Sequence, residues 1–215
     1  MDRETRKKKP RPRNADPGEA PTRASLHEAA LSYLARGAAS ADSVAKTLTR
    51  RIGNWARRAT RAGRDAEAVA QDAAAARERI AEIVGRLGEV GLVNDVVFAE
   101  TRAKRMSSAG RSRRAISAHL AQKGIAAETV REALPHDATA ELAAAVAFAR
   151  KRRLGPFARD TRDTEALESR DAKRAADKKA LGAMARAGFD FSVCDRVLRM
   201  DRDEAETRLR ERREF

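Results

Sequence analysis

Six basic residues and no acidic residue occupy the stretch 102–114. They are Arg102, Lys104, Arg105, Arg111, Arg113 and Arg114. Arginine predominates, and its planar guanidinium group binds phosphate or carboxylate through two parallel hydrogen bonds. Several of these residues fall where a helix is expected to begin, and cations there oppose the helix dipole. Because that placement costs stability, we predict a binding role for the stretch rather than a merely solvated helix surface.

Further basic residues are weaker candidates for the same role. Lys123 follows the stretch, and Arg150 and Arg152 belong to a later basic run. That run lies at an expected helix C-terminus, where cations are favoured in any case, so a solvated helix end explains it equally well. Trp55 stands beside two arginines and is able either to stack on a base or to pack between helices.

We find no constellation of residues that would support catalysis. The three histidines, His27, His119 and His136, are far apart in the sequence, and Cys194 has no second cysteine with which to build a metal site. The sequence contains neither a P-loop nor a glycine-rich dinucleotide-binding loop, and it offers no carboxylate pair for a nuclease. We therefore predict a protein that is not an enzyme and that needs no cofactor or metal.

Composition limits the class of protein and its partners. The 215 residues are 42% hydrophobic, 36% charged and only 4% aromatic, with a net charge of +14. The basic surplus is spread along the chain, which suits an extended polyanion or a filament that contains one. A single cysteine, no apolar stretch long enough for a membrane and no apolar core near the N-terminus predict a cytoplasmic protein.

Helical spacing of apolar residues runs through the chain, and patterns typical of strands are absent, so we predict an all-α fold. Ser40 and Ser112 stand at positions typical of helix N-caps, and Gly110 and Gly124 at helix ends. Aligning Gly124 with Gly188 superposes four further apolar pairs, which indicates a repeat. The pairs are Ile125 with Phe189, Leu120 with Met184, Val130 with Cys194, and Leu134 with Leu198.

From these patterns we predict three tandem three-helix repeats after a disordered, proline-containing basic arm. The arm covers 1–24, and the repeats cover 25–91, 92–136 and 137–215. The third repeat includes an inserted loop at 154–168 and a final C-terminal helix. A core of Phe98, Ile116, Leu120 and Val130 is expected in the second repeat.

Two motifs in the second repeat resemble those of the RecX family of RecA regulators. The first is Leu92-Val93-Asn94-Asp95 followed by Phe98-Ala99, and the second runs from Gly110 through Ile116 and Leu120 to Lys123-Gly124-Ile125. The resemblance is specific over 91–134 and collinear over roughly 26–205. One departure is Ala126, which stands where a helix N-cap is expected.

The resemblance implies both a fold and a function. The family's fold is an elongated, curved array of three such repeats, and its members bind along the groove of the RecA–DNA filament. They suppress ATP hydrolysis, strand exchange and co-protease activity, which places them in homologous recombination, DNA repair and the SOS response. We expect a monomer that binds the RecA filament, with single-stranded DNA contacted through the filament or directly.

An independent, non-specific DNA-binding or architectural protein is the alternative. The third helix of the second repeat argues against reading of bases, because it offers Glu128, Thr129, Arg131 and Glu132 where a recognition helix would present Arg, Asn or Gln. The residues do not distinguish an inhibitor from a stimulator, or capping of filament ends from coating of the groove.

Overall fold

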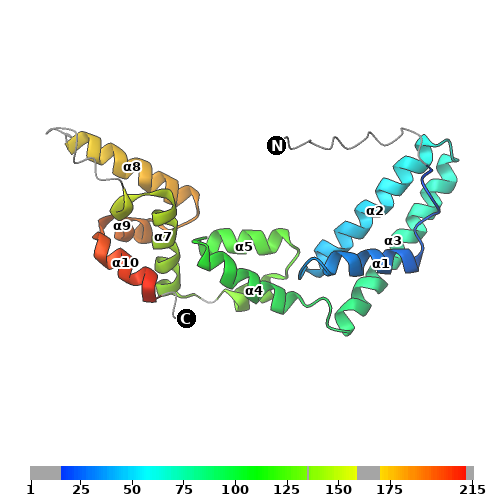
Figure 1. Ribbon diagram of the computed structural model, residues 1–215, viewed down its shortest axis with the longest axis horizontal. Helices are drawn as coiled ribbons and strands as arrows, with labels where there is room; N and C mark the ends of the chain where they lie inside the picture. The colour runs from blue at the N-terminus through cyan, green and yellow to red at the C-terminus, as the bar shows by residue number, and fades with distance from the viewer. Residues whose placement is uncertain (1–15, 135, 159–169, 212–215) are drawn as a thin grey trace, which may run out of the picture. The chain divides into compact units, whose positions relative to one another are not determined.

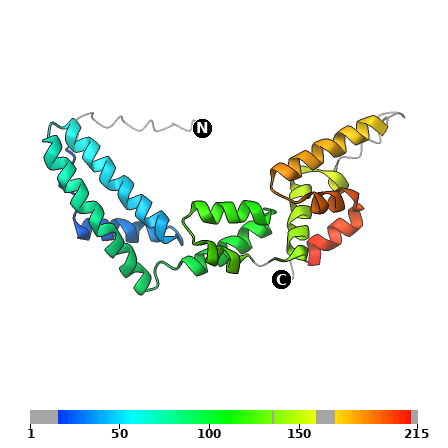
Figure 2. The same ribbon diagram turned by 180° about the vertical axis from the view of Figure 1, so that it is seen from behind.

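The computed structural model describes residues 16–134, 136–158 and 170–211, and within these it contains ten α-helices, one 3₁₀ turn and no strand. The prediction of an all-α fold is therefore confirmed. The chain divides into two compact units, residues 1–94 and residues 95–215. Figures 1 and 2 show the helices of each unit from opposite sides.

Unit 1 contains three helices around one core. The helices are α1 (Arg23–Leu34), α2 (Ala41–Arg61) and α3 (Ala66–Glu89). Ser40 caps α2 as predicted, because its side chain accepts a hydrogen bond from the N–H of Ser43 at 3.2 Å. Val44, Leu48 and Ile52 recur at helical spacing on α2 and are fully buried against α1 and α3.

The N-terminal end of unit 1 differs from the prediction of an arm that extends to residue 24. Helix α1 already begins at Arg23, with the Thr22 side chain accepting a hydrogen bond from the N–H of Ser25. Pro17 and Pro21 are buried, so the segment before α1 packs on the unit instead of extending from it. Residues 1–15 of the predicted arm lie outside the described residues.

Unit 2 begins with the three helices of the predicted second repeat. They are α4 (Asp95–Ser108), α5 (Arg113–Gln122) and α6 (Ala127–Ala133). Ile116, Leu120 and Val130 form their core, as predicted, with Ala99, Ala103 and Ile125. Phe98 is only half-buried and packs against the edge of that core.

The rest of unit 2 has its own core. The elements are α7 (Ala138–Arg152), the 3₁₀ turn η1 (Gly155–Phe157), α8 (Arg170–Arg186), α9 (Phe191–Arg199) and α10 (Arg202–Glu211). Met184, Cys194 and Val197 are fully buried among them. Most of the predicted loop at 154–168 lies outside the described residues, but its first part forms η1 and buries Phe157.

The repeat seen in the sequence has a counterpart in the backbone. After α5, Gly124 has a φ of 75° and the next N–H, of Ile125, returns to the Leu120 carbonyl at 3.2 Å. After α8, Gly188 has a φ of 91° and the N–H of Phe189 returns to the Met184 carbonyl at 3.3 Å. Both helices therefore end in the same left-handed glycine turn, which carries an apolar residue into the core.

A close junction joins α4–α6 to α7–α10 inside unit 2. The Ser112 hydroxyl donates a hydrogen bond to the Ala187 carbonyl at 2.6 Å while also accepting one from the N–H of Ala115. Gly110 packs so tightly on α7 that a Cβ there would lie 2.8 Å from the Phe148 nitrogen. These contacts fix the start of α5 on α7 and α8.

Candidate functional site

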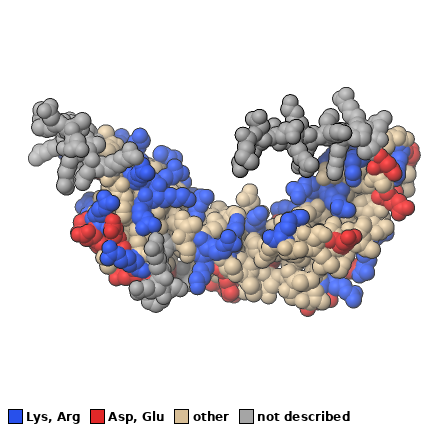
Figure 3. All heavy atoms as spheres, in the orientation of Figure 1, with Lys and Arg blue, Asp and Glu red and all other residues tan. Residues whose placement is uncertain are grey.

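The candidate site is built on the end of α4, the turn to α5 and the two ends of α5. We call it the α4–α5 cluster. Its members are Arg102, Lys104, Arg105, Arg111, Arg113, Arg114 and Lys123. Figure 3 shows Lys and Arg side chains gathered where α5 begins beside α7.

Three members of the cluster surround one imidazole. The Arg102 guanidinium donates from Nε to His119 Nε2 at 3.2 Å, which joins α4 to α5. Partial burial lowers the pKa of His119 below its usual 6.5, and the positive charges of Arg102, Lys123 and Arg111 lower it further. His119 therefore favours its neutral form beside three cations, and a bound anion would offset the repulsion among those cations.

Arg113 differs from its neighbours because it is tied into the structure. Its Nε donates to the Leu134 carbonyl at 3.1 Å, and its backbone N–H donates to Glu141 Oε2 at 2.9 Å. Glu141 comes from α7 and caps the N-terminus of α5. Its negative charge offsets the unfavourable placement of cations at that helix start, so the placement costs less stability than the sequence alone indicates.

The environment of Glu141 shows how this cap is tuned. Burial raises the pKa of Glu141, and the nearby charge of Asp190 raises it as well, whereas the hydrogen bond from the N–H of Arg113 opposes the rise. Burial thus disfavours the ionised form of Glu141, whereas the hydrogen bond to the N-terminus of α5 favours that form.

Arg105, Arg111 and Arg114, together with Lys104, are exposed members of the cluster, and the three arginines are the ones suited to bidentate contacts. All three side chains are solvent-exposed, and none forms an ion pair within the described residues. Their unpaired guanidinium groups are the members best placed to reach a phosphate or a carboxylate of a partner.

Arg150 and Arg152 lie in the last turn of α7 and are exposed. The Arg152 guanidinium lies over the Phe148 ring, 5.9 Å from its centroid. No hydrogen bond connects either residue to the α4–α5 cluster within the described part of the chain. Favourable placement at a helix C-terminus is enough to explain them.

Residues with other potential chemistry occupy structural positions. Cys194 is fully buried, its thiol faces the Phe189 carbonyl at 3.7 Å, and burial raises the pKa of the thiol. Trp55 is buried too, which excludes the base-stacking role considered for it. Across residues 16–134, 136–158 and 170–211, no three His, Cys, Asp or Glu side chains are grouped to hold a metal ion. None of the helices in these ranges is long and apolar enough to cross a membrane.

Sequence reasoning missed two features. The capping role of Glu141 had no signal, because Glu141 lies 28 residues from Arg113 in the chain. It also missed a row of arginines on α2, although the spacing of Arg50, Arg51, Arg57, Arg58 and Arg61 places them on one helix face.

Comparison with known proteins agrees with the helical units. The family model for the second three-helix domain of RecX matches residues 94–134, which span α4, α5 and α6. The regulatory protein RecX of Myxococcus xanthus (strain DK1622) is 35% identical over 176 residues, which cover 80% of this chain and 83% of that protein.

Two further relatives match over shorter stretches. The regulatory protein RecX of Agrobacterium fabrum (strain C58) is 38% identical over 114 residues, covering 53% of this chain and 55% of that protein. The regulatory protein RecX of Thermobifida fusca (strain YX) is 34% identical over 123 residues, covering 57% and 60%.

Proposed function

The chain belongs to the RecX family of regulatory proteins, and from that premise we propose that it binds the RecA–DNA filament and inhibits its ATP hydrolysis, strand exchange and co-protease activity. We include in this proposal that the protein acts as a cytoplasmic monomer, without a cofactor and without catalysing a reaction itself.

The observation that carries the proposal is the exposed charge of three arginines that form no ion pair among the described residues and lie within the segment that matches the family model. Arg105, Arg111 and Arg114 present guanidinium groups from α4, from the turn and from α5. A filament offers two complementary ligands, namely DNA phosphates and acidic side chains on the recombinase surface. Arginine binds both in the same bidentate geometry.

Inhibition follows if the protein bridges adjacent subunits of the filament. ATP turnover requires those subunits to move relative to one another. A ligand that binds one arrangement more tightly shifts the population towards it by its differential affinity and slows the cycle. The cluster would supply one of the contacts that hold that arrangement.

Exchange of the exposed arginines for glutamate tests the proposal. The double variant Arg111→Glu with Arg114→Glu removes two exposed cations and spares Arg113, whose hydrogen bond to Leu134 supports the fold. We expect it to lose suppression of the DNA-dependent ATPase of RecA while its melting temperature stays close to that of the wild type. The matched control is Lys179→Glu with Arg196→Glu, which reverses two exposed charges on α8 and α9.

Salt titration separates the two kinds of ligand. If both arginines contact phosphates of single-stranded DNA, the slope of log affinity against log salt should be shallower in the variant by about 1.4, which is about 0.7 for each lost contact. Contacts to acidic RecA side chains would weaken binding without that change. A folded double variant that still suppresses the ATPase at the wild-type concentration would refute the site.

Direct reading of DNA bases is a poor alternative for this unit. In α6, Arg131 pairs with Glu128 of the same helix, and Glu132 is exposed. The helix therefore presents one paired cation and an exposed acid, where a base-reading helix would present hydrogen-bond donors.

A further inference from the structure

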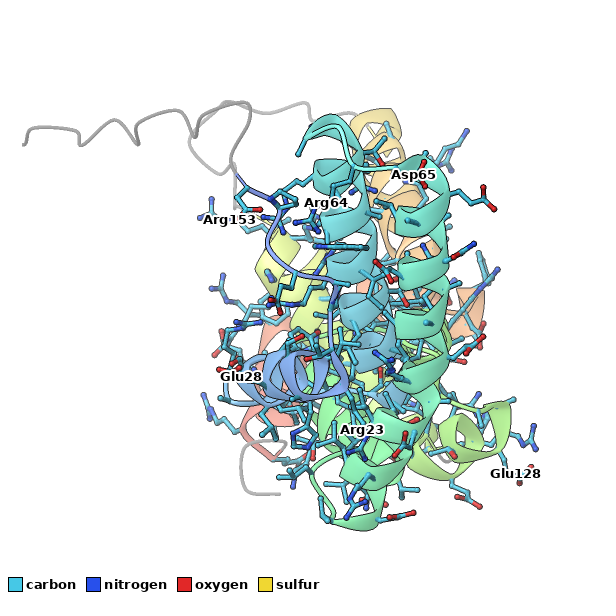
Figure 4. All side chains as sticks on the ribbon, turned by 90° about the vertical axis from the view of Figure 1, so that its right-hand side faces the viewer. Arg23, Glu28, Arg64, Asp65, Glu128 and Arg153 are labelled. Carbon is cyan, nitrogen blue, oxygen red and sulfur yellow. The ribbon has the colours of Figure 1, made fainter. Side chains whose placement is uncertain are left out.

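Unit 1 contains an open groove with a volume of about 1100 Å³ between residues 17–22, α1 and α2. Six arginines line it. They are Arg36, Arg50, Arg51, Arg57, Arg58 and Arg61. Only two acidic residues, Glu19 and Glu28, share the lining, so the groove is strongly positive. Figure 3 shows Lys and Arg side chains gathered along α2, and Figure 4 shows Glu28 on α1.

The arginines of α2 form a straight row. Arg50, Arg51, Arg57, Arg58 and Arg61, with Asn54 between them, share one face of the helix, because each lies three or four residues from another member of the set. From Arg50 to Arg61 the helix rises about 16 Å, at 1.5 Å per residue. The row contains no acid, whereas the opposite face of α2 is apolar and buried through Leu48, Ile52 and Trp55.

The contacts of the groove arginines leave their charge unpaired in the part of the chain that the structure describes. Among the described residues none of the six arginines forms an ion pair. Arg57 and Arg58 hydrogen bond to the side chain and the carbonyl of Asn54, respectively, and the Arg36 guanidinium lies over the Tyr33 ring, 5.4 Å from its centroid. By contrast Lys46, on the same helix, pairs with Asp42 at 2.6 Å. A bound anion would relieve the repulsion along the row.

The wall opposite α2 is held in place by specific contacts. The Trp55 indole donates from Nε1 to the Gly18 carbonyl at 3.2 Å, and Pro17 and Pro21 are buried. Arg64, which follows α2, pairs with Asp16 at 3.7 Å at the start of the wall. Figure 4 shows Arg64 at the turn between α2 and α3. Because the wall is fixed, the groove exists before any ligand binds.

We propose that this groove binds the phosphodiester backbone of a nucleic-acid strand without sequence preference. A strand of B-form DNA presents a phosphate about every 3.4 Å along its axis, so a row of about 16 Å spans four or five phosphates. Arginines bind phosphates along a backbone whatever the bases are. The proposal concerns unit 1 alone and needs no RecA, so it does not depend on the function proposed above.

Two other occupants fit the groove less well. Contacts between proteins usually place an aromatic or aliphatic side chain in an apolar pocket at their centre. Trp55 in this groove is only 3% exposed, so it does not offer an acidic protein surface such a pocket. The chain's own first fifteen residues include seven Lys and Arg residues and only Asp2 and Glu4 as acids. Their net charge is positive, like that of the groove, so the groove repels them.

The test measures binding of the full-length protein to labelled oligothymidylate, and to a mixed-sequence duplex, in the absence of RecA. The groove variant is Arg50→Ala with Arg51→Ala and Arg61→Ala. The control removes the same charge from exposed positions of α3 outside the groove, as Arg77→Ala with Arg79→Ala and Arg86→Ala. Circular dichroism melting verifies that both variants are folded.

We expect the groove variant to bind oligothymidylate about tenfold more weakly or worse, with a salt slope shallower by about 2 for three lost contacts. The control should stay within about threefold of the wild type, which is the effect of net charge alone. Comparison of the two nucleic acids identifies whether a single strand or a duplex is the preferred form.

A polyglutamate peptide serves as a further probe, because it mimics an acidic protein surface. Three results would overturn the proposal: unchanged affinity of the groove variant for oligothymidylate, an equal loss in the control, or a loss confined to binding of the polyglutamate peptide. A second measurement needs no variant. Phenylglyoxal should modify Arg50, Arg51 and Arg61 of the wild-type protein, and bound oligothymidylate should protect them but not the α3 arginines. Equal protection of both sets would count against the groove.

Discussion

The individual arginines of the α4–α5 cluster are not equivalent, although they look so in the sequence. Arg102 and Arg113 are engaged with His119 and with the Leu134 carbonyl, respectively, whereas Arg111 and Arg114 are exposed and unpaired among the described residues. A charge reversal at Arg113 would remove a hydrogen bond and bring a second carboxylate near Glu141. Functional and structural roles are therefore separable only when Arg113 is left intact.

The protonation of His119 gives a test of the cluster at the scale of one residue. Because its pKa is lowered in the folded protein, the unfolded chain takes up the proton first as the pH falls below 6.5. The stability tied to neutral His119 is thus complete above pH 6.5 and is lost as the pH falls towards the folded pKa. We expect the wild type to lose more stability than His119→Gln between about pH 7 and pH 5.

An NMR titration of the His119 ring measures the pKa directly. A value of 6.5 or higher in the free protein would contradict the assignment. Bound phosphate should raise the pKa, because an anion stabilises the imidazolium form.

At the scale of elements, the local signals in the sequence predicted well. Ser40 and Ser112 cap their helices, Gly124 ends α5, and Ala126 leaves α6 without a side-chain cap, all as expected. Each of these depends on residues within one turn of the position concerned. The contacts that join elements were not predictable, because they link distant positions: Ser112 and Ala187 are 75 residues apart, and Arg113 and Glu141 are 28 apart.

The packing of Gly110 shows what such a contact demands of a residue. The sequence indicated a glycine that ends a helix, and the φ of 78° agrees. It gave no sign that α7 lies directly against the backbone there. Even a residue able to adopt that φ would place its Cβ 2.8 Å from the Phe148 nitrogen and 3.2 Å from the Ala144 carbonyl oxygen.

We therefore expect Gly110→Ala to lower the free energy of unfolding by about 2 to 4 kcal/mol, through strain at positive φ and a backbone clash. The control is Gly85→Ala in α3, which meets no atom within 4 Å and should gain about 0.5 to 1 kcal/mol from helix propensity. Urea denaturation of both variants measures the difference. If the two substitutions changed the free energy of unfolding by the same amount, α4 would not end against α7 in this way.

At the scale of the whole molecule, the chain carries its basic surfaces on both units. The groove belongs to unit 1 and the α4–α5 cluster to unit 2, so the two basic surfaces come from separate parts of the chain. This matches a net charge of +14 that is distributed instead of confined to a tail. The separate variants proposed for each surface then report on separate contacts.

The junction inside unit 2 makes a prediction about cooperativity. The cores of α4–α6 and α7–α10 are distinct, yet Ser112, Gly110 and Glu141 bind them through backbone groups. Leu120 is fully buried, so Leu120→Ala should cost about 2 to 5 kcal/mol in its own core. Because the start of α5 is fixed on α7 and α8, we expect that loss to be shared. Hydrogen exchange should quicken in α7 and α8 as well as in α4–α6.

The reciprocal variant makes the comparison specific. Leu48→Ala empties a fully buried position of the unit 1 core and should quicken exchange in α1–α3 while α7 and α8 keep their protection. Each variant thus serves as the control for the other. If Leu120→Ala left the exchange of α7 and α8 unchanged, the contacts of Ser112 and Glu141 would be too weak to couple the two cores, and α4–α6 would have to be treated as an independent folding unit.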